Sequence, residues 1–492
     1  MTHARSPQKF KSALPALLAF AFAFLLWPAF ALADSSSVFL REGLPWRLRL
    51  ADSTGDFELK FRVSAYDSVF AVSFDGRDDH VDNEAMAVLE FEGMLTPKFR
   101  FTGSTRVGND RTTRDDIPEH FYDPYDGYPY NKQSGSTRTW DIFNVSLEYD
   151  VPFGKLLAGI DYLELGVARH NHVILRGSEY RYRPWQDSSY RLQIPAPTPY
   201  FGYEFSVGPL TYTQLGAKLY HEKDLGKYMH THRLEARLPA KVTVGVSEIV
   251  VYGSTVEAAG SNLNEDADST GRDFEWSYMI PFVPFVFEEH FHGDKDNEAL
   301  AFDLSVKTLR GWDFYGEMLW DDMKSPTEIF DDSWWGNKWA ATVGVEAIRK
   351  FFGTWFIWIF EYTRVEPWVY THHKGAGYNY TSYGQSLGTD LGPNSQELYT
   401  SLEAEWEHFK VKLYASNVAK DTAFGSSLYD IHTPLDATDK EFLAEETTYR
   451  YRELGLEVSF APWTWLWMKA GGSLYFGDYE GYRLEGAGGF AW

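Results

Sequence analysis

The feature that most constrains this chain is a two-residue alternation of apolar and polar side chains, which recurs in segments of about ten residues. In the segment 297–307, Leu300 and Phe302 share one parity, while Asp303 and Ser305 share the other. Successive side chains of a strand point to opposite faces of a sheet, so such a segment predicts a strand with one apolar and one polar face. The pattern therefore predicts an all-β fold.

Several of these segments follow one another closely enough to form antiparallel hairpins. The expected hairpins join 300–306 to 312–321, 398–407 to 409–415, and 234–238 to 242–246. Further strands are expected at 57–63, 68–74, 85–92, 98–107, 140–149, 162–169, 200–207, 211–220, 338–347, 354–363, 451–460, 464–476 and 482–492. From roughly sixteen to twenty candidates we predict eighteen strands, because a closed membrane barrel needs an even number.

Two folds use strands of this kind, a β-sandwich and a transmembrane barrel. The polar faces carry charges of both signs, and the strand ends carry Trp and Tyr, which prefer the membrane interface. Short turns alternate with long loops, such as 109–137 and 370–395. Beyond the N-terminal region there is no apolar run long enough for a transmembrane helix. These observations favour a transmembrane antiparallel β-barrel with long extracellular loops.

The N-terminus predicts export. Residues 1–33 carry basic residues, then an apolar run at 13–27, then the small-residue sequence Ala31-Leu32-Ala33. This is the order of a secretory signal peptide that is removed on export. Residues 34–492 are then expected to form one barrel domain, with 34–56 as a periplasmic or lumenal segment.

The C-terminus predicts the destination. Tyr482, Leu484 and Phe490 share the parity of the final residue, Trp492, whereas Arg483 and its like-parity neighbours are polar or small. We interpret this as a lipid-facing strand whose last aromatic residue lies at the membrane interface. It resembles the terminal strand that the outer-membrane barrel assembly machinery recognises. The expected location is the outer membrane of a Gram-negative bacterium.

Charge and composition exclude several classes of function. The chain has 70 acidic and 46 basic residues, a net charge of −24, which argues against binding nucleic acid. It has no cysteine, so disulfides and thiolate metal sites are excluded. No catalytic signature is present. The pairs at 230–232 and 372–373 offer too few histidines for a metal site, and the acidic clusters 78–82 and 294–298 lack the spacing of a calcium shell. We expect no enzyme activity and no cofactor.

The segment 360–398 is the most distinctive in the chain. It contains E-Y-T-R, then P and Y-T-H, then Y-x-x-Y-G, L-G and L-G-P-N. In this order it resembles the segment by which Wzi-like capsule-assembly outer-membrane proteins are recognised. The resemblance is strongest over 361–394 and extends from about residue 162 to the C-terminus. The supporting stretches are 232–253, 279–305, 314–323 and 337–345.

The resemblance implies an eighteen-stranded outer-membrane lectin that holds capsular polysaccharide or exopolysaccharide at the cell surface, with polysaccharide export machinery as a partner. Independently, the loop 115–131 interleaves acidic and aromatic residues, and the loop 368–383 adds further aromatic residues and a histidine. Such polar and aromatic groups suit sugar hydroxyls and sugar rings. The candidate binding residues are Tyr122, Tyr125, Glu361, Arg364, Trp368, Tyr370, His372, Tyr378 and Tyr380. For any single tyrosine the alternative is a place in a wet loop or at the membrane rim, and for Arg364 it is a lumenal salt bridge that pins the loop.

A second set of residues is expected to line the lumen as structural groups. Glu248 breaks the parity of its strand, so we predict a β-bulge at Ser247 that turns its carboxylate inward. The segment 280–291 has two prolines and no alternation, and it is expected to fold into the lumen. The strand-end residues Asn297, Asp321 and Asp322 complete this set. An occluded lumen would follow.

Two functions remain open. A polysaccharide-binding protein predicts a filled lumen and aromatic, acidic outer loops. A passive porin for small solutes predicts an open lumen and, because of the acidic excess, a preference for cations. The long segment 361–394 favours the first, since a bare pore rim does not need it.

Overall fold

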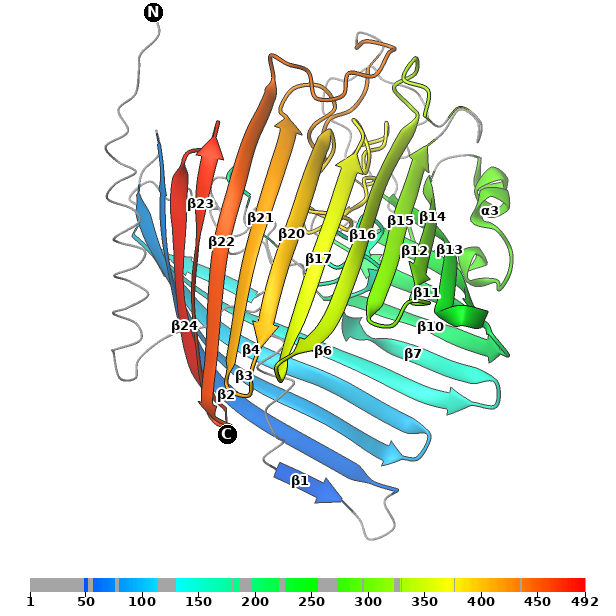
Figure 1. Ribbon diagram of the computed structural model, residues 1–492. Coiled ribbons are helices and arrows are strands. Elements are labelled where there is room, and N and C mark those ends of the chain that lie inside the picture. Colours follow the sequence, from blue (N-terminus) through cyan, green and yellow to red (C-terminus); the bar gives the residue numbers. More distant parts are fainter. Residues whose placement is uncertain are drawn as a thin grey trace, which may run out of the picture.

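Eighteen antiparallel strands form a closed ring in the computed structural model (Figure 1). The structure describes residues 48–51, 56–75, 79–113, 130–178, 181, 183–185, 197–220, 226–254, 272–293, 296–322, 328, 330–375, 377–433 and 436–491. The ring strands are β2 (Glu58–Phe74), β3 (His80–Thr96), β4 (Phe99–Thr112), β6 (Thr137–Val151), β7 (Gly154–Asp161), β10 (Thr198–Val207), β11 (Leu210–Leu219), β12 (Lys227–Leu238), β13 (Val242–Gly253), β14 (Asn297–Val306), β15 (Trp312–Asp322), β16 (Lys338–Phe351), β17 (Thr354–Val365), β20 (Ser395–Glu405), β21 (Phe409–Asp421), β22 (Thr448–Trp463), β23 (Leu466–Gly477) and β24 (Gly481–Ala491). The predicted fold and strand number are confirmed.

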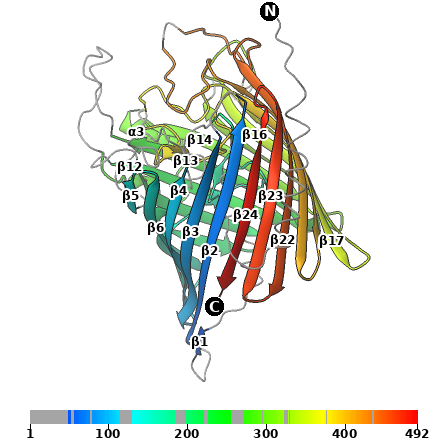
Figure 2. The same cartoon turned by 90° about the vertical axis from the view of Figure 1, so that its left-hand side faces the viewer.

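Each ring strand pairs with its neighbour in the chain, and the last strand pairs with the first. Antiparallel pairing of β24 with β2 closes the ring, for example between Phe490 and Ala65. Short turns join the strands at one end, called the turn end below, and longer connections lie at the other, the loop end (Figures 1 and 2). Two minor strands extend the sheet, β1 (Leu48–Ala51) beside β2 and β5 (Tyr130–Ser134) beside β6.

The predicted alternation holds in the ring. On β14, Leu304 is 43% exposed on the outer face, whereas its neighbour Asp303 is 3% exposed and faces the lumen. On the final strand, Phe490 is exposed on the outer face and stacks on Trp465, while Arg483 and Glu485 form an inward ion pair. The predicted signal peptide 1–33, most of the segment 34–56 and Trp492 lie outside the described residues.

Charges of opposite sign pair across neighbouring strands on the inner face. Arg62 on β2 contacts Glu90 on β3 at 2.6 Å, and Lys60 contacts Glu92 at 2.7 Å. Facing opposite charges stabilise adjacent strands, and here they also remove unpaired charge from an enclosed space. At these positions the inner wall is polar, and its charges are paired.

Two long connections fold into the ring instead of leaving it. The connection after β7 contains the small hairpin of β8 (Glu164–Leu165) and β9 (Leu175–Arg176), so the strand predicted at 162–169 is wrong. The connection after β17 contains the hairpin of β18 (Thr381–Ser382) and β19 (Gln385–Ser386). Their apolar residues share one buried cluster with inner residues of the wall, including Leu319 and Val365. The described parts of 162–185 and 366–394 are called the plug below.

A third connection takes the opposite side of the wall. Residues 272–293 carry the short helices η2 (Ser277–Met279) and α3 (Phe285–His292), and they lie outside the ring beside β11–β13 (Figures 1 and 2). The prediction that 280–291 enters the lumen is therefore wrong. The bulge predicted at Ser247 is also wrong, because β13 pairs with β12 and β14 without a shift in register. Glu248 keeps the outward parity of Val246.

Among the described residues, no helix is long and apolar enough to cross a membrane.

Candidate functional site

The first part of the plug is held by one carboxylate of the wall. Glu317, at the middle of β15, accepts hydrogen bonds from the backbone N–H groups of Val167 at 2.6 Å, Ala168 at 2.9 Å and Val173 at 2.6 Å. Buried backbone donors need such acceptors, because water is excluded. The chain reaches Glu317 through Gly166, whose φ of +119° favours glycine. A Cβ at residue 166 would lie 2.1 Å from Oε2 of Glu317.

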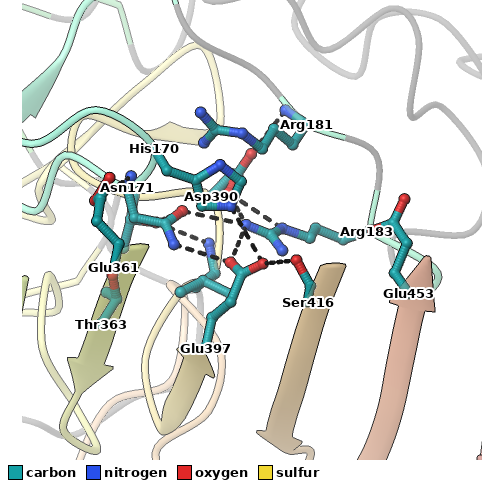
Figure 3. A network of polar contacts seen from close by, with 12 residues as sticks. His170, Asn171, Arg181, Arg183, Glu361, Thr363, Asp390, Glu397, Ser416 and Glu453 are labelled. Carbon is teal, nitrogen blue, oxygen red and sulfur yellow. Dashed lines mark hydrogen bonds and ion pairs between the residues drawn. The ribbon is translucent and has the colours of Figure 1, made fainter. Parts of the chain in front are cut away.

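Two further wall carboxylates continue this arrangement on neighbouring strands. Glu361 on β17 accepts from the backbone N–H groups of Arg169 at 3.1 Å and Asn171 at 3.3 Å. Glu397 on β20 accepts from Nδ2 of Asn171 at 2.9 Å and from Oγ of Ser416 at 2.6 Å. Figure 3 shows Glu361, Glu397 and Ser416 pointing from adjacent strands toward the same turn of the plug.

The two halves of the plug are joined by a buried ion pair. Arg183 contacts Asp390 at 3.0 Å and Glu397 at 2.9 Å, and the backbone N–H of Arg181 donates to Asp390 at 2.8 Å (Figure 3). Burial by itself would raise the pKa of Asp390, but the positive charges of Arg183 and Arg181 outweigh it and hold that pKa below its usual value. The carboxylate therefore stays ionised and binds both halves together.

His170 lies in the same network as a neutral ring. It stacks on Tyr399 with 3.4 Å between ring centroids, and its Nε2 lies 3.2 Å from Glu397. Burial, with the positive charge of Arg181, lowers the pKa of His170 to about 3. Protonation of this ring therefore opposes the closed plug.

Two tyrosines of the distinctive segment, Tyr370 and Tyr380, are buried supports of the plug. The hydroxyl of Tyr370 donates to the carbonyl of Val173 at 2.8 Å, and that of Tyr380 donates to the carbonyl of Ile174 at 2.9 Å. Their rings stack on each other, and the backbone N–H of Tyr370 donates to Asp321 at 2.7 Å. Burial raises the pKa of Tyr370, so its hydroxyl remains a donor.

The other candidates of this segment also lie in or beside the plug. Trp368 and Tyr378 are buried, and His372 is half-buried, with its pKa lowered to about 2 by burial. Arg364 faces outward near the loop end, where it contacts Glu366 at 2.6 Å and the ring of Phe442 at 3.7 Å. It is therefore an ion pair on the outer side of the wall, not the lumenal salt bridge considered from sequence. Tyr122 and Tyr125 lie outside the described residues.

The residues expected to line the lumen divide into two groups. Asp321 and Asn297 face inward, where Nδ2 of Asn297 donates to the carbonyl of Tyr378 at 2.9 Å. Asp322 is more exposed and lies 3.8 Å from Lys338. Glu248 lies on the outer face, where it accepts from the backbone N–H of Phe285 at 2.7 Å.

Above the plug, two loops form a surface that sequence reasoning did not find. It consists of the described residues of 328–337 and 422–447, called the cap below. Trp335 stacks on His432 with 3.8 Å between ring centroids, and its backbone N–H donates to the carbonyl of Thr438 at 2.7 Å. Trp334 lies beside Trp335, and the exposed side chains of this surface include Phe330 and Tyr429. The cap therefore presents partly exposed aromatic faces at the loop end.

The cap and the plug are physically connected. Trp368 of the plug lies edge-on to Trp335 and His432 of the cap. Asn394, the last residue of the plug, donates to the carbonyls of Phe424 at 2.7 Å and Glu441 at 3.1 Å, and it accepts from the backbone N–H of Leu443 at 2.9 Å. The plug thus fixes the position of the cap.

Among the described residues, no group of three His, Cys, Asp or Glu side chains is arranged to hold a metal ion.

Comparison with known proteins supports the fold. No family model matches the chain, and no curated protein matches it. A similar solved structure is Wzi of Escherichia coli, described as an outer-membrane, carbohydrate-binding β-barrel involved in group 1 capsule assembly. It is 13% identical, covers 87% of this chain and 83% of its own, and has a TM-score of 0.51. The chain is an outer-membrane barrel of a Gram-negative bacterium.

Two porins are also similar, but their TM-scores are below 0.5, so no function is inferred from them. OpdK of Pseudomonas aeruginosa, solved with vanillate, is 8% identical, with coverage of 89% and 98% and a TM-score of 0.47. A BenF-like porin of Pseudomonas fluorescens is 8% identical, with coverage of 88% and 98% and a TM-score of 0.46.

Proposed function

We propose that this protein belongs with the Wzi-like capsule-assembly proteins and binds capsular polysaccharide or exopolysaccharide at the cell surface. The single observation that carries the proposal is the plug. Three wall carboxylates hold it: Glu317 and Glu361 accept from backbone N–H groups of the plug, and Glu397 accepts from the side-chain amide of Asn171. Many buried polar contacts are therefore used to close the lumen. A channel for solutes does not need such a plug. An outer binding surface does need a rigid base, and the plug provides one.

The binding surface in this proposal is the cap. Aromatic faces stack on sugar rings, and carboxylates and amides pair with hydroxyls. Trp334, Trp335 and Tyr429 supply rings, and Asp332 and Asp436 supply acceptors in the same two loops. Tyr122 and Tyr125, which follow β4 in the chain, are proposed to add to this surface.

The residues of the distinctive segment then act mainly by positioning. Glu361, Tyr370 and Tyr380 hold the plug closed, and Trp368 supports Trp335 from beneath. Arg364 pairs with Glu366, which also binds Lys440 of the cap at 2.9 Å. His372 and Tyr378 lie farther along the same loop. In this proposal they shape the surface that the sugar meets, without each touching it.

The charge of the cap favours a particular class of polymer. The segment 422–447 has six acidic residues and one lysine, and 328–337 has three acidic residues and no basic one. Such a surface repels polyuronates and suits neutral or amino-bearing polymers. Partners of the export machinery and of barrel assembly remain part of the proposal, as the family resemblance implies.

Equilibrium binding of purified surface polysaccharide to the detergent-solubilised full chain tests the proposal. We expect saturable binding that falls at least tenfold in Trp335→Ala and is largely kept in Trp335→Phe. The matched control is Trp355→Ala, which removes an exposed tryptophan at the turn end. Absence of saturable binding to any polymer, together with a steady cation-preferring conductance, would favour the passive porin instead.

A further inference from the structure

The connection 272–293, called the flap below, is bound to the outer wall by side chains of three strands. Gln214 donates to the carbonyl of Tyr278 at 2.6 Å, and Tyr203 donates to the carbonyl of Met279 at 2.9 Å. In the other direction, the hydroxyl of Tyr252 accepts from the backbone N–H of Glu275 at 2.7 Å. Wall side chains therefore supply the hydrogen-bond partners of these three backbone groups of the flap.

The wall beneath the flap is polar where a lipid-facing wall should be apolar. Gln214, His232 and Glu248 are consecutive cross-strand partners on the outward parity of β11, β12 and β13. His232 contacts Glu248 at 3.0 Å, and Glu248 also accepts from the backbone N–H of Phe285. The ring of Phe285, which is fully buried, lies over His232 with 4.3 Å between centroids.

This polar row lies at the height of the membrane. Glu248 is six residues beyond Val242, where β13 begins. At roughly 3.3 Å per residue and a strand tilt of about 40°, it lies about 15 Å above the turn end, within an apolar band about 25 Å tall. A bare carboxylate is unfavourable there, so the flap covers a site that hydrocarbon would otherwise meet.

Between Trp276 and Phe287 the exposed side chains of the flap are apolar, whereas Asp273 and His290 are exposed near its two ends. Trp276 and Phe282 are 66% and 68% exposed, and Ile280 and Phe287 are exposed as well. Below them on the same wall, Leu234 and Leu304 are exposed on the apolar outer face. The exposed apolar side chains of the flap therefore lie on the same outer side of the wall as the lipid-facing belt.

We propose that residues 272–293 are embedded in the outer leaflet and present Trp276, Ile280, Phe282 and Phe287 to its acyl chains. Irregular backbone is excluded from hydrocarbon unless protein satisfies its polar groups. The wall side chains Gln214, Tyr203, Tyr252 and Glu248 satisfy four backbone groups of the flap in this way. The segment thus seals a polar patch of the wall and broadens the hydrophobic perimeter of the barrel on one side.

Site-directed spin labelling tests the proposal directly, because the natural chain has no cysteine. Phe282→Cys and Phe287→Cys are labelled in the full chain reconstituted into phospholipid vesicles. Leu304→Cys, on the apolar belt, is the lipid control, and Tyr429→Cys, on the cap, is the aqueous control. Collision rates are measured with oxygen, which concentrates in hydrocarbon, and with a water-soluble nickel chelate.

At both flap positions we expect the collision rate with oxygen to exceed that with the nickel chelate, as it does at residue 304. The collision rate with the nickel chelate should be at least fivefold lower than at residue 429. Nickel access equal to that at residue 429 overturns the proposal. So does spin–spin broadening that disappears on dilution with unlabelled protein, because the occupant is then a second copy. A further variant, Phe285→Ala, removes the anchoring ring and is expected to raise nickel access at residue 282, whereas Phe314→Ala elsewhere on the belt should not.

Discussion

Glu317 on β15 accepts a hydrogen bond of 2.6 Å from the backbone N–H of Val173, 144 residues earlier in the chain. The same carboxylate also accepts from Val167 and Ala168, so it closes a turn of the plug around itself. A fixed carboxylate satisfies three donors that would otherwise be buried without acceptors. We therefore expect this contact to stabilise the closed lumen.

Glu317→Ala is therefore expected to loosen the plug. Each hydrogen bond to a charged acceptor contributes about 1.5–3 kcal/mol, so the closed state loses several kcal/mol. In planar bilayers the variant should show frequent openings that the natural chain lacks. Glu403→Ala is the control, because Glu403 also faces the lumen but pairs with Lys410 near the turn end. Equal behaviour of the two variants would remove Glu317 from this role.

Gly166→Ala should open the plug without removing any polar group. The new Cβ meets Oε2 of Glu317 at 2.1 Å, and φ at residue 166 is +119°. Gly353→Ala is a matched control, since φ there is +87° but no atom lies within 4 Å of the added Cβ. We expect faster amide hydrogen exchange over 162–178 in the first variant only. Similar exchange in both would show that the contact with Glu317 can relax.

The closed plug is expected to weaken in acid because of His170. Its pKa is about 3 when buried against an ordinary value of 6.5, so protons bind the open form preferentially. The contribution of neutral His170 to the stability of the closed plug is fully present above pH 6.5. It falls as the pH decreases toward 3, by at most about 1.4 kcal/mol per pH unit. Hydrogen exchange over 162–178 measured from pH 7 to pH 4 should show this slope.

His170→Asn should flatten that slope, because an amide can still donate to Glu397 and has no charge to gain. The flattening is expected to be partial, since the pKa of His372 is lowered in the same direction. An unchanged pH dependence in the variant would assign the effect to other groups.

Asn394 is expected to couple the plug to the cap. Glycine tolerates the φ of +52° at residue 394, so Asn394→Gly should not strain the backbone. The substitution removes all three side-chain hydrogen bonds to the cap loop. We expect hydrogen exchange to rise over 422–447 and polysaccharide binding to weaken at least fivefold, while the lumen remains closed. Asn109→Gly, on the opposite part of the ring, is the control. Unchanged binding would show that the cap keeps its shape without this link.

The ring could be predicted from sequence because each strand carries its own signal. Leu304 and Asp303 differ in parity, and parity alone places one outside and the other inside. The roles of the plug residues could not be predicted in this way. Glu317 is one inward acid among many, and only the turn at Gly166, distant in sequence, distinguishes it. Burial of Tyr370 and Tyr380 likewise depends on a partner segment some 200 residues away.

The sequence signal for the flap is a row of polar residues at outward positions of three neighbouring strands. Glu248 breaks the apolar parity of β13, and we predicted a bulge to turn it inward. Gln214 and His232 break parity on the neighbouring strands at the same height. One polar residue suggests a local bulge, but an aligned row of three requires a cover on the outer face. The proline-rich segment 280–291 supplies it.

The most direct test of whether the plug closes the lumen is the conductance of the purified full chain in planar bilayers at neutral pH. We predict no steady conductance above that of the bare bilayer, because the plug fills the lumen from the wall strands inward. A large, steady, cation-selective conductance from the natural sequence would contradict it.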